Sequence, residues 1–212
     1  METQEIKVYT ENEKRIRINK ATQEQCWKFA EDWVAKHPTK YKDTGQDNLE
    51  LIKKQIFFGK VGEAAAQIFS EENFPGSLIS DVDYEIYEDS EKSWEADLKV
   101  DTRPLHVKSY CANMWANKIP RSWTWQYKSA NGRTDDLFST KNVHRKDLIV
   151  CCDVSDCEID KNLYVDIMIV SEWGKLLPYM AYPVFSSQKN YKRSIYYQTV
   201  LDVANNEEFI TI

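Results

Sequence analysis

The chain has 212 residues, of which 42% are hydrophobic and 29% charged, and its formal net charge is −6. This composition is that of a globular protein with a sizeable core, so it excludes a disordered, collagen-like or low-complexity chain. No apolar run approaches the roughly 18 to 20 residues of a membrane span, and the charged N-terminus lacks the apolar stretch of a secretory signal. Five Cys without a CxxC pair indicate reduced thiols. We therefore expect a cytoplasmic protein with no membrane partner.

Two helices are expected in the first third of the chain. Thr22 and Gln25 form a capping-box pattern, and apolar residues recur at helical spacing until Pro38, which predicts an N-terminal helical segment at 20–37. A second capping-box pattern opens a helix at residue 47 that runs to about residue 70.

Glycines interrupt the apolar pattern of this second helix. Gly59 and Gly62 cost helix stability, but they would let the backbone approach a neighbour closely. Glu63 shares a helix face with Ile56 and Ala66, so its carboxylate should point inward, toward whatever the helix packs on.

Strand-like segments follow at 78–87, 94–100, 105–109, 148–154 and 163–170. A hairpin-like turn, Asp101-Thr102-Arg103-Pro104, separates the second from the third. The last two are apolar runs of strand length, as expected of strands covered on both faces. Residues 111–146 have no clear assignment, and the tail from residue 186 fits either helix or strand. We expect one α/β domain over 1–212, with a core at about 47–171 and a C-terminal appendage at 175–212.

Charge is distributed unevenly along this acidic chain. Residues 81–97 hold eight acids and a single Lys, whereas residues 99–146 hold ten bases and three acids. A local basic field attracts a polyanion whatever the total charge is, so the basic middle is compatible with nucleic-acid binding. The alternative interpretation is an ordinary solvated face.

Chemistry-bearing residues recur around the predicted hairpin. Asp97 lies in an apolar-flanked segment, where an acid needs a partner or a ligand. His106 and Lys108 share one face of the next strand because side chains repeat every two residues. Glu63 can reach the same place from the packed helix. Two carboxylates with a backbone carbonyl and waters suit Mg²⁺, and a Lys beside the ion would orient an attacking water, which is the chemistry of phosphodiester hydrolysis.

The segment Phe58-Gly59-Lys60-Val61-Gly62-Glu63-Ala64-Ala65, followed by Asp97 and then by His106-Val107-Lys108, resembles the PD-(D/E)XK nuclease superfamily. The resemblance covers about residues 49–170. It implies a restriction-endonuclease-like α/β fold with a central mixed sheet flanked by helices.

Carried over to this sequence, the resemblance makes Glu63 the helix glutamate, Asp97 the metal-binding aspartate and Lys108 the catalytic lysine. The backbone carbonyl of Val107 would be a further metal ligand. This chain has Ala96 where the family has Pro, and His106 where the family has an acid. A neutral imidazole suits Mg²⁺ less well than a carboxylate, so His106 is either a ligand or a supporting group for water or phosphate.

Further residues are expected to contact nucleic acid. Bases interleaved with aromatic residues suit phosphate contact and base stacking, although core burial of Trp123 or Trp125 is the competing interpretation. The expected contacts are Ser109, Arg121, Trp123, Gln126, Lys128, Arg133, Lys189, Lys192 and Arg193.

Together these observations predict a Mg²⁺-dependent DNA endonuclease, restriction-like or phage-type, in which Mn²⁺ substitutes for Mg²⁺. Such a protein would work in a bacterial cytoplasm, or in the host cell if a phage encodes it. Cutting both strands with one site per chain favours a homodimer. The alternatives are a structure-specific, resolvase-like nuclease, an RNA-directed nuclease on the same fold, and a catalytically silent nucleic-acid-binding module.

Overall fold

The computed structural model describes residues 6–39, 48–87, 96–115, 119–127, 138, 145–185, 188–190 and 192–207. Its helices are α1 (Lys20–Lys36), α2 (Leu49–Asn73), α3 (Ala112–Trp115), α4 (Trp173–Leu176), the 3₁₀ turn η3 (Leu177–Tyr179) and α5 (Tyr197–Glu207). Its strands are β1 (Lys7–Val8), β2 (Arg15–Arg17), β3 (Leu98–Val100), β4 (Arg103–Cys111), β5 (Ser122–Gln126), β6 (Leu148–Val154), β7 (Tyr164–Glu172) and β8 (Lys192–Tyr196).

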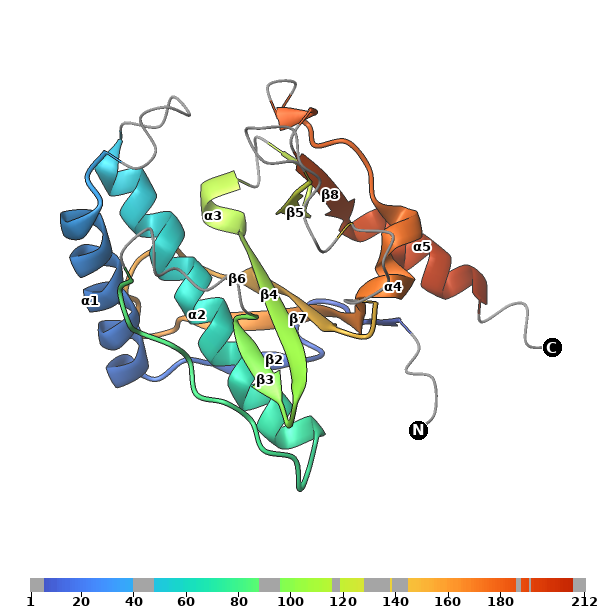
Figure 1. Cartoon of the computed structure of the whole chain (residues 1–212), viewed down its shortest axis with the longest axis horizontal. Helices are drawn as coiled ribbons and strands as arrows, with labels where there is room; N and C mark the ends of the chain where they lie inside the picture. Colours follow the sequence, from blue (N-terminus) through green and yellow to red (C-terminus); the bar gives the residue numbers. More distant parts are fainter. Residues whose placement is uncertain are drawn as a thin grey trace.

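A mixed sheet with the order β1-β7-β6-β4-β3 forms the centre of the molecule, and β2 also pairs with β7 (Figure 1). The β4–β6 pair is parallel, and the other pairs in this sheet are antiparallel. Helix α2 crosses one face of the sheet, with α1 outside it (Figure 1). The expected α/β class, with a mixed sheet flanked by helices, is therefore confirmed.

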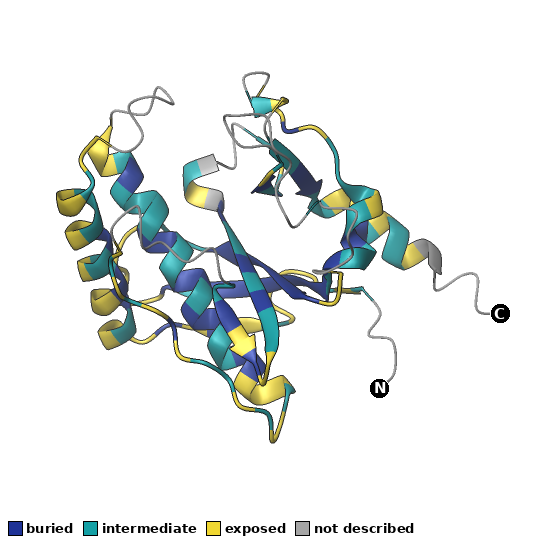
Figure 2. Cartoon of the chain, viewed as in Figure 1, coloured by how far each residue is buried: buried dark blue, intermediate teal, exposed yellow. Residues whose placement is uncertain are grey.

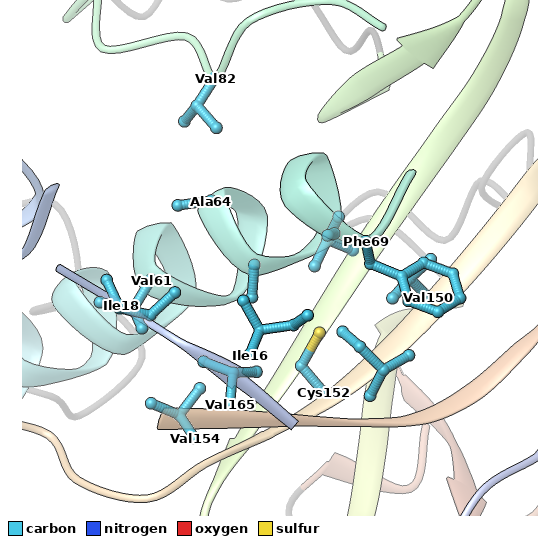
Figure 3. Close-up of a cluster of buried hydrophobic side chains, with 14 of the residues drawn as sticks. Ile16, Ile18, Val61, Ala64, Phe69, Val82, Val150, Cys152, Val154 and Val165 are labelled. Carbon is cyan, nitrogen blue, oxygen red and sulfur yellow. The ribbon is translucent and has the colours of Figure 1, made fainter. Parts of the chain in front are cut away.

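The core between α2 and the sheet consists mainly of small and branched side chains. Val61 and Phe69 of α2 meet Val150 and Val165 of the central strands in one cluster (Figure 3). The outer face of α1 is exposed, whereas the central strands are buried (Figure 2). Helix α2 therefore joins the sheet to the N-terminal helix.

The opposite face of the sheet is covered by a second, two-stranded sheet, β5–β8, and by α4. Trp123 and Trp125 of β5 point into this layer with Trp173 of α4, and the rings of Trp125 and Trp173 lie 5.3 Å apart. This second cover explains why every residue of β6 is buried. The prediction that 148–154 is a strand covered on both faces is confirmed.

Both helix starts differ from the capping-box prediction. The N-cap of α1 is Asn19, whose side chain accepts a hydrogen bond from the backbone N–H of Thr22, so Thr22 lies inside the helix. The N-cap of α2 is Asn48, which accepts from Leu51 N–H. Asn is as good an N-cap as Ser or Asp. Neither Asn19 nor Asn48 is followed three residues later by the Glu or Gln that defines a capping box.

The predicted strand at 78–87 is wrong. Ile79 forms an isolated bridge with Val100, and residues 80–87 form no strand. Val82 instead donates its N–H to the side-chain Oε1 of Gln67 on α2. Backbone pairing with β3 is therefore confined to the start of the segment, where Ser80 donates its N–H to the carbonyl of Lys99.

The hairpin is confirmed, although its first strand is shorter than expected. β3 and β4 pair from Leu98 with Leu105 to Val100 with Arg103. Asp101 in the turn has a φ of 55°, a left-handed conformation that Asp tolerates better than most residues. The sequence analysis missed β1 and β2, which have only two and three residues and therefore show no periodicity.

Candidate active site

Glu63 projects from α2 and is only 14% exposed. Lys60, nearly one turn earlier, places its Nζ 2.6 Å from Oε2 of Glu63 and also donates to the backbone carbonyl of Asp83. The ammonium of Lys60 lies 4.8 Å from the centre of the Phe29 ring. The helix therefore carries its own counter-ion for the glutamate, which the sequence analysis did not assign.

Asp97 lies at the point where β3 and β4 separate. Strand pairing begins at Leu98 with Leu105, and Asp97, the residue before it, accepts the backbone N–H of Val107 on Oδ2 at 2.7 Å. If β3 were longer, a backbone carbonyl of β3 would accept the N–H of Val107. Here the carboxylate of Asp97 accepts it instead. This bond holds Asp97 against β4 between His106 and Lys108.

Glu63, Asp97 and Lys108 lie within electrostatic reach of one another. The pKa of Glu63 is raised to about 7, mainly by burial and also by the negative charge of Asp97. The positive charges of Lys60 and Lys108 oppose this shift. Asp97 and Lys108 thus both act on the charge of Glu63, and the shared site of these residues stays a prediction.

His106 has a partner that the sequence analysis missed. Its Nε2 lies 3.0 Å from Oδ2 of Asp147, and the two side chains are 14% and 6% exposed. Asp147 directly precedes β6, which runs parallel to β4 beside it. The position of Asp147 directly before a mainly apolar strand is the sequence feature that could have indicated this partner. Because Nε2 is engaged, only Nδ1 of this ring is left as a metal donor.

The donor set for a metal ion is small. In the parts of the chain that the structure describes, no three His, Cys, Asp or Glu side chains are close enough together to hold an ion. The negative charge of Asp97 opposes ionisation of Glu63, and a divalent cation would relieve that cost. Such a pair, completed by a carbonyl and waters, matches the oxygen preference of Mg²⁺.

Two expected nucleic-acid contacts are corrected by the structure. Trp123 is 1% exposed and donates its Nε1–H to the carbonyl of Cys152, so it is a core residue and cannot stack on a base. The Oγ of Ser109 is buried beneath Gly62 of α2, so it cannot reach a phosphate. Alternation along β5 and β4 puts these side chains on covered faces.

Arg121 also has a structural position. Its Nη2 lies 2.8 Å from Asp153 on β6 and 2.6 Å from Glu11 in the turn between β1 and β2. The guanidinium is therefore already paired with two carboxylates inside the protein. The prediction that Arg121 contacts a phosphate is therefore wrong.

The remaining expected contacts lie near the start of β8. Lys189 is exposed, and Lys192 pairs in register with the exposed Gln126 of β5. Burial lowers the pKa of Lys192, and the nearby positive charge of Lys108 lowers it further. The β5–β8 sheet also contacts β4, the strand that carries Lys108. Lys128 and Arg133 lie outside the described residues.

Comparison of the chain with known protein families, curated proteins and solved structures finds no match. The family resemblance therefore rests on the residues of the helix and the hairpin alone. Across the described residues, no helix has both the length and the apolar character needed to cross a membrane.

Proposed function

We propose that this chain is a metal-dependent DNA endonuclease with a restriction-endonuclease-like core. The observation that carries the proposal is the convergence of Glu63, Asp97 and Lys108 where β3 and β4 separate. Paired acids beside a lysine, with one acid disfavoured in its charged form, are typical of functional sites. A homodimer, with one site per strand of the duplex, completes the proposal.

Glu63, Asp97 and the carbonyl of Val107 would hold the Mg²⁺. In an extended strand the N–H and the C=O of one residue point to the same side. Since the N–H of Val107 points to Asp97, its carbonyl faces the same opening. When bound, the ion lowers the pKa of a coordinated water and shields the charge of the scissile phosphate.

Lys108 would donate to the attacking water or to a phosphate oxygen, an interaction that strengthens as charge develops. His106 shares its face of β4, and Asp147 holds the imidazole in one orientation. Lys60 would give up part of its contact with Glu63 when the cation enters, since both compete for the same carboxylate.

The test is cleavage of supercoiled plasmid in Mg²⁺ or Mn²⁺, with and without EDTA. We expect nicked and linear products only with metal, and a loss of roughly 10²-fold or more in rate for Lys108→Ala. Lys161→Ala, an exposed lysine in the turn before β7, is the matched control and should cut at the normal rate. Circular dichroism of both variants checks their folding.

Cleavage that persists in EDTA or in Lys108→Ala would contradict the proposal. Branched DNA and RNA belong in the same assay, because the resolvase-like and RNA-directed alternatives use the same site.

A catalytically silent nucleic-acid-binding module is the second candidate. The Lys60–Glu63 ion pair and the contact between His106 and Asp147 favour it, because they supply internal partners for groups that a nuclease would use on metal or water. Uncut substrates together with salt-sensitive DNA binding would support this candidate.

A further inference from the structure

A group of large apolar side chains lies exposed between η3 and β8. Tyr182, Val184 and Phe185 are 60%, 48% and 43% exposed. The backbone before them is anchored, because Ala181 exchanges two hydrogen bonds of 2.9 Å with Ser194 of β8. Clustered exposed apolar residues on an anchored segment mark an interaction surface. We call Tyr182, Val184, Phe185, Lys189 and Arg193 the aromatic-basic surface.

Arg193 is built into this surface as a stacked cation. The centre of its guanidinium lies 4.0 Å from the ring centre of Tyr127 and 4.4 Å from that of Tyr182. Its Nη1 donates to the carbonyls of Lys189 and Lys192. The aromatic and cationic groups are therefore adjacent, and Arg193 is held in one orientation.

The charge of this part of the chain is of one sign. From residue 173 to residue 201 the sequence has four cations, Lys175, Lys189, Lys192 and Arg193, and no Asp or Glu. In a chain with a net charge of −6, such a stretch is complementary to a polyanion. A second copy of the chain would be a poor partner, because a two-fold interface brings like charges of the same patch together.

The aromatic-basic surface is close to the candidate active site. Strand β5, which pairs with β8, contacts β4, the strand that carries Lys108. The β5–β8 sheet, which carries this surface, lies on the far side of the main sheet from α2 (Figure 1). A nucleic acid bound at Lys108 can extend onto this surface.

We infer that the aromatic-basic surface binds unpaired nucleotides of a nucleic acid, with Tyr182 and Phe185 stacking on bases and Lys189 and Arg193 contacting phosphates. Only bases outside a duplex offer their faces to side chains, and stacking of this kind tolerates any sequence. The inference rests on the proposed function for its biological use. It would make the substrate a nucleic acid with a single-stranded segment beside the cleaved bond.

The experiment is fluorescence anisotropy with labelled dT20, rU20 and a 20-base-pair duplex, in EDTA so that no cleavage occurs. We expect Tyr182→Ala with Phe185→Ala to weaken dT20 binding about tenfold or more. Duplex binding should change by less than about twofold, because phosphate contacts dominate there. Ile159→Ala is the control, since Ile159 is 41% exposed and lies in the turn before β7.

Unchanged dT20 binding by the double variant would overturn the inference, as would an equal loss on dT20 and the duplex. Weakened self-association without any effect on dT20 would also overturn it, and would assign the surface to a partner copy. The ratio of rU20 to dT20 affinity identifies RNA or DNA as the source of the unpaired strand. Weaker binding of either one by the variant that lacks the Tyr182 and Phe185 rings supports the inference. If binding depends on these two rings but no substrate is cleaved in Mg²⁺, the proposed function is contradicted and the inference about this surface stands.

Discussion

Glu63 bears the electrostatic cost of assembling the candidate site. Its carboxylate lies inside the protein beside a second acid, and two lysines offset only part of that cost. Structural stability alone would favour an uncharged residue here. A bound cation would offset this cost, which agrees with the proposal that Glu63 is a metal ligand.

The pKa of Glu63 predicts a pH-dependent stability. The pKa rises from an ordinary 4.5 to about 7 in the folded chain. Between these values the folded protein holds a proton that the unfolded chain releases, so the contribution of Glu63 to stability falls as the pH rises from about 4.5 to 7. The total fall is about 3 kcal/mol.

Glu63→Gln lacks this titration, so it should gain stability relative to the wild type between pH 5 and pH 8. Urea unfolding of both proteins in EDTA measures the difference. Glu24→Gln, on the exposed face of α1, should show no such pH dependence. A constant difference between wild type and Glu63→Gln at both pH values would disprove the assignment.

Helix α2 approaches the sheet closely at Gly62. A Cβ on Gly62 would lie 1.9 Å from Oγ of Ser109 on β4 and 3.7 Å from Cβ of Cys152 on β6. Gly59 has no neighbouring atom within 4 Å of such a Cβ, so the expectation of close approach holds at Gly62 and is wrong at Gly59. The approach at Gly62 sets how near Glu63, the next residue, comes to the hairpin.

We expect Gly62→Ala to destabilise the protein by about 1–3 kcal/mol, because the core is overpacked there. Gly59→Ala should instead stabilise it by about 0.5–1 kcal/mol through helix propensity. Adding Ser109→Ala to Gly62→Ala should restore part of the loss, since it removes the closest atom. Urea unfolding of the wild type and the three variants checks this, and equal effects at the two glycines would contradict it.

Arg121 connects the two layers of the molecule. It directly precedes β5, pairs with Asp153 on the main sheet, and places its guanidinium 5.4 Å from the ring centre of Tyr197 on α5. Burial raises the pKa of Asp153 to about 6, and the charge of Arg121 opposes the shift. The position of the β5–β8 sheet over the main sheet therefore depends on a buried ion pair.

We expect Arg121→Met to cost about 3 kcal/mol, because it leaves the carboxylate of Asp153 buried without its partner. Adding Asp153→Asn should recover part of this loss. Lys28→Met, which breaks an exposed pair with Asp32 on α1, should have little effect. Thermal unfolding of the three variants is the measurement, and similar Tm values for Arg121→Met and Lys28→Met would contradict the prediction.

Periodicity and spacing were sufficient for much of this molecule. The helical repeats, the hairpin turn and the apolar run at 148–154 each arise from local constraints on the backbone, and they were predicted with errors of a few residues at the ends. The prediction that Glu63, Asp97 and Lys108 form one site uses the same local patterns, since a helix face and a hairpin register together determine which side chains can meet.

Partners distant in the sequence could not be obtained in this way. Alternation indicated that Trp123 and Trp125 share a face of β5, but whether that face meets solvent or protein depends on α4, which follows far along the chain. Likewise, the pairing of His106 with Asp147 and of Arg121 with Asp153 depends on which strands become neighbours. Local sequence specifies the direction of a side chain along its own element. Which residues cover that side chain depends on long-range packing, because burial of apolar groups and pairing of charges are decided by contacts across the whole chain.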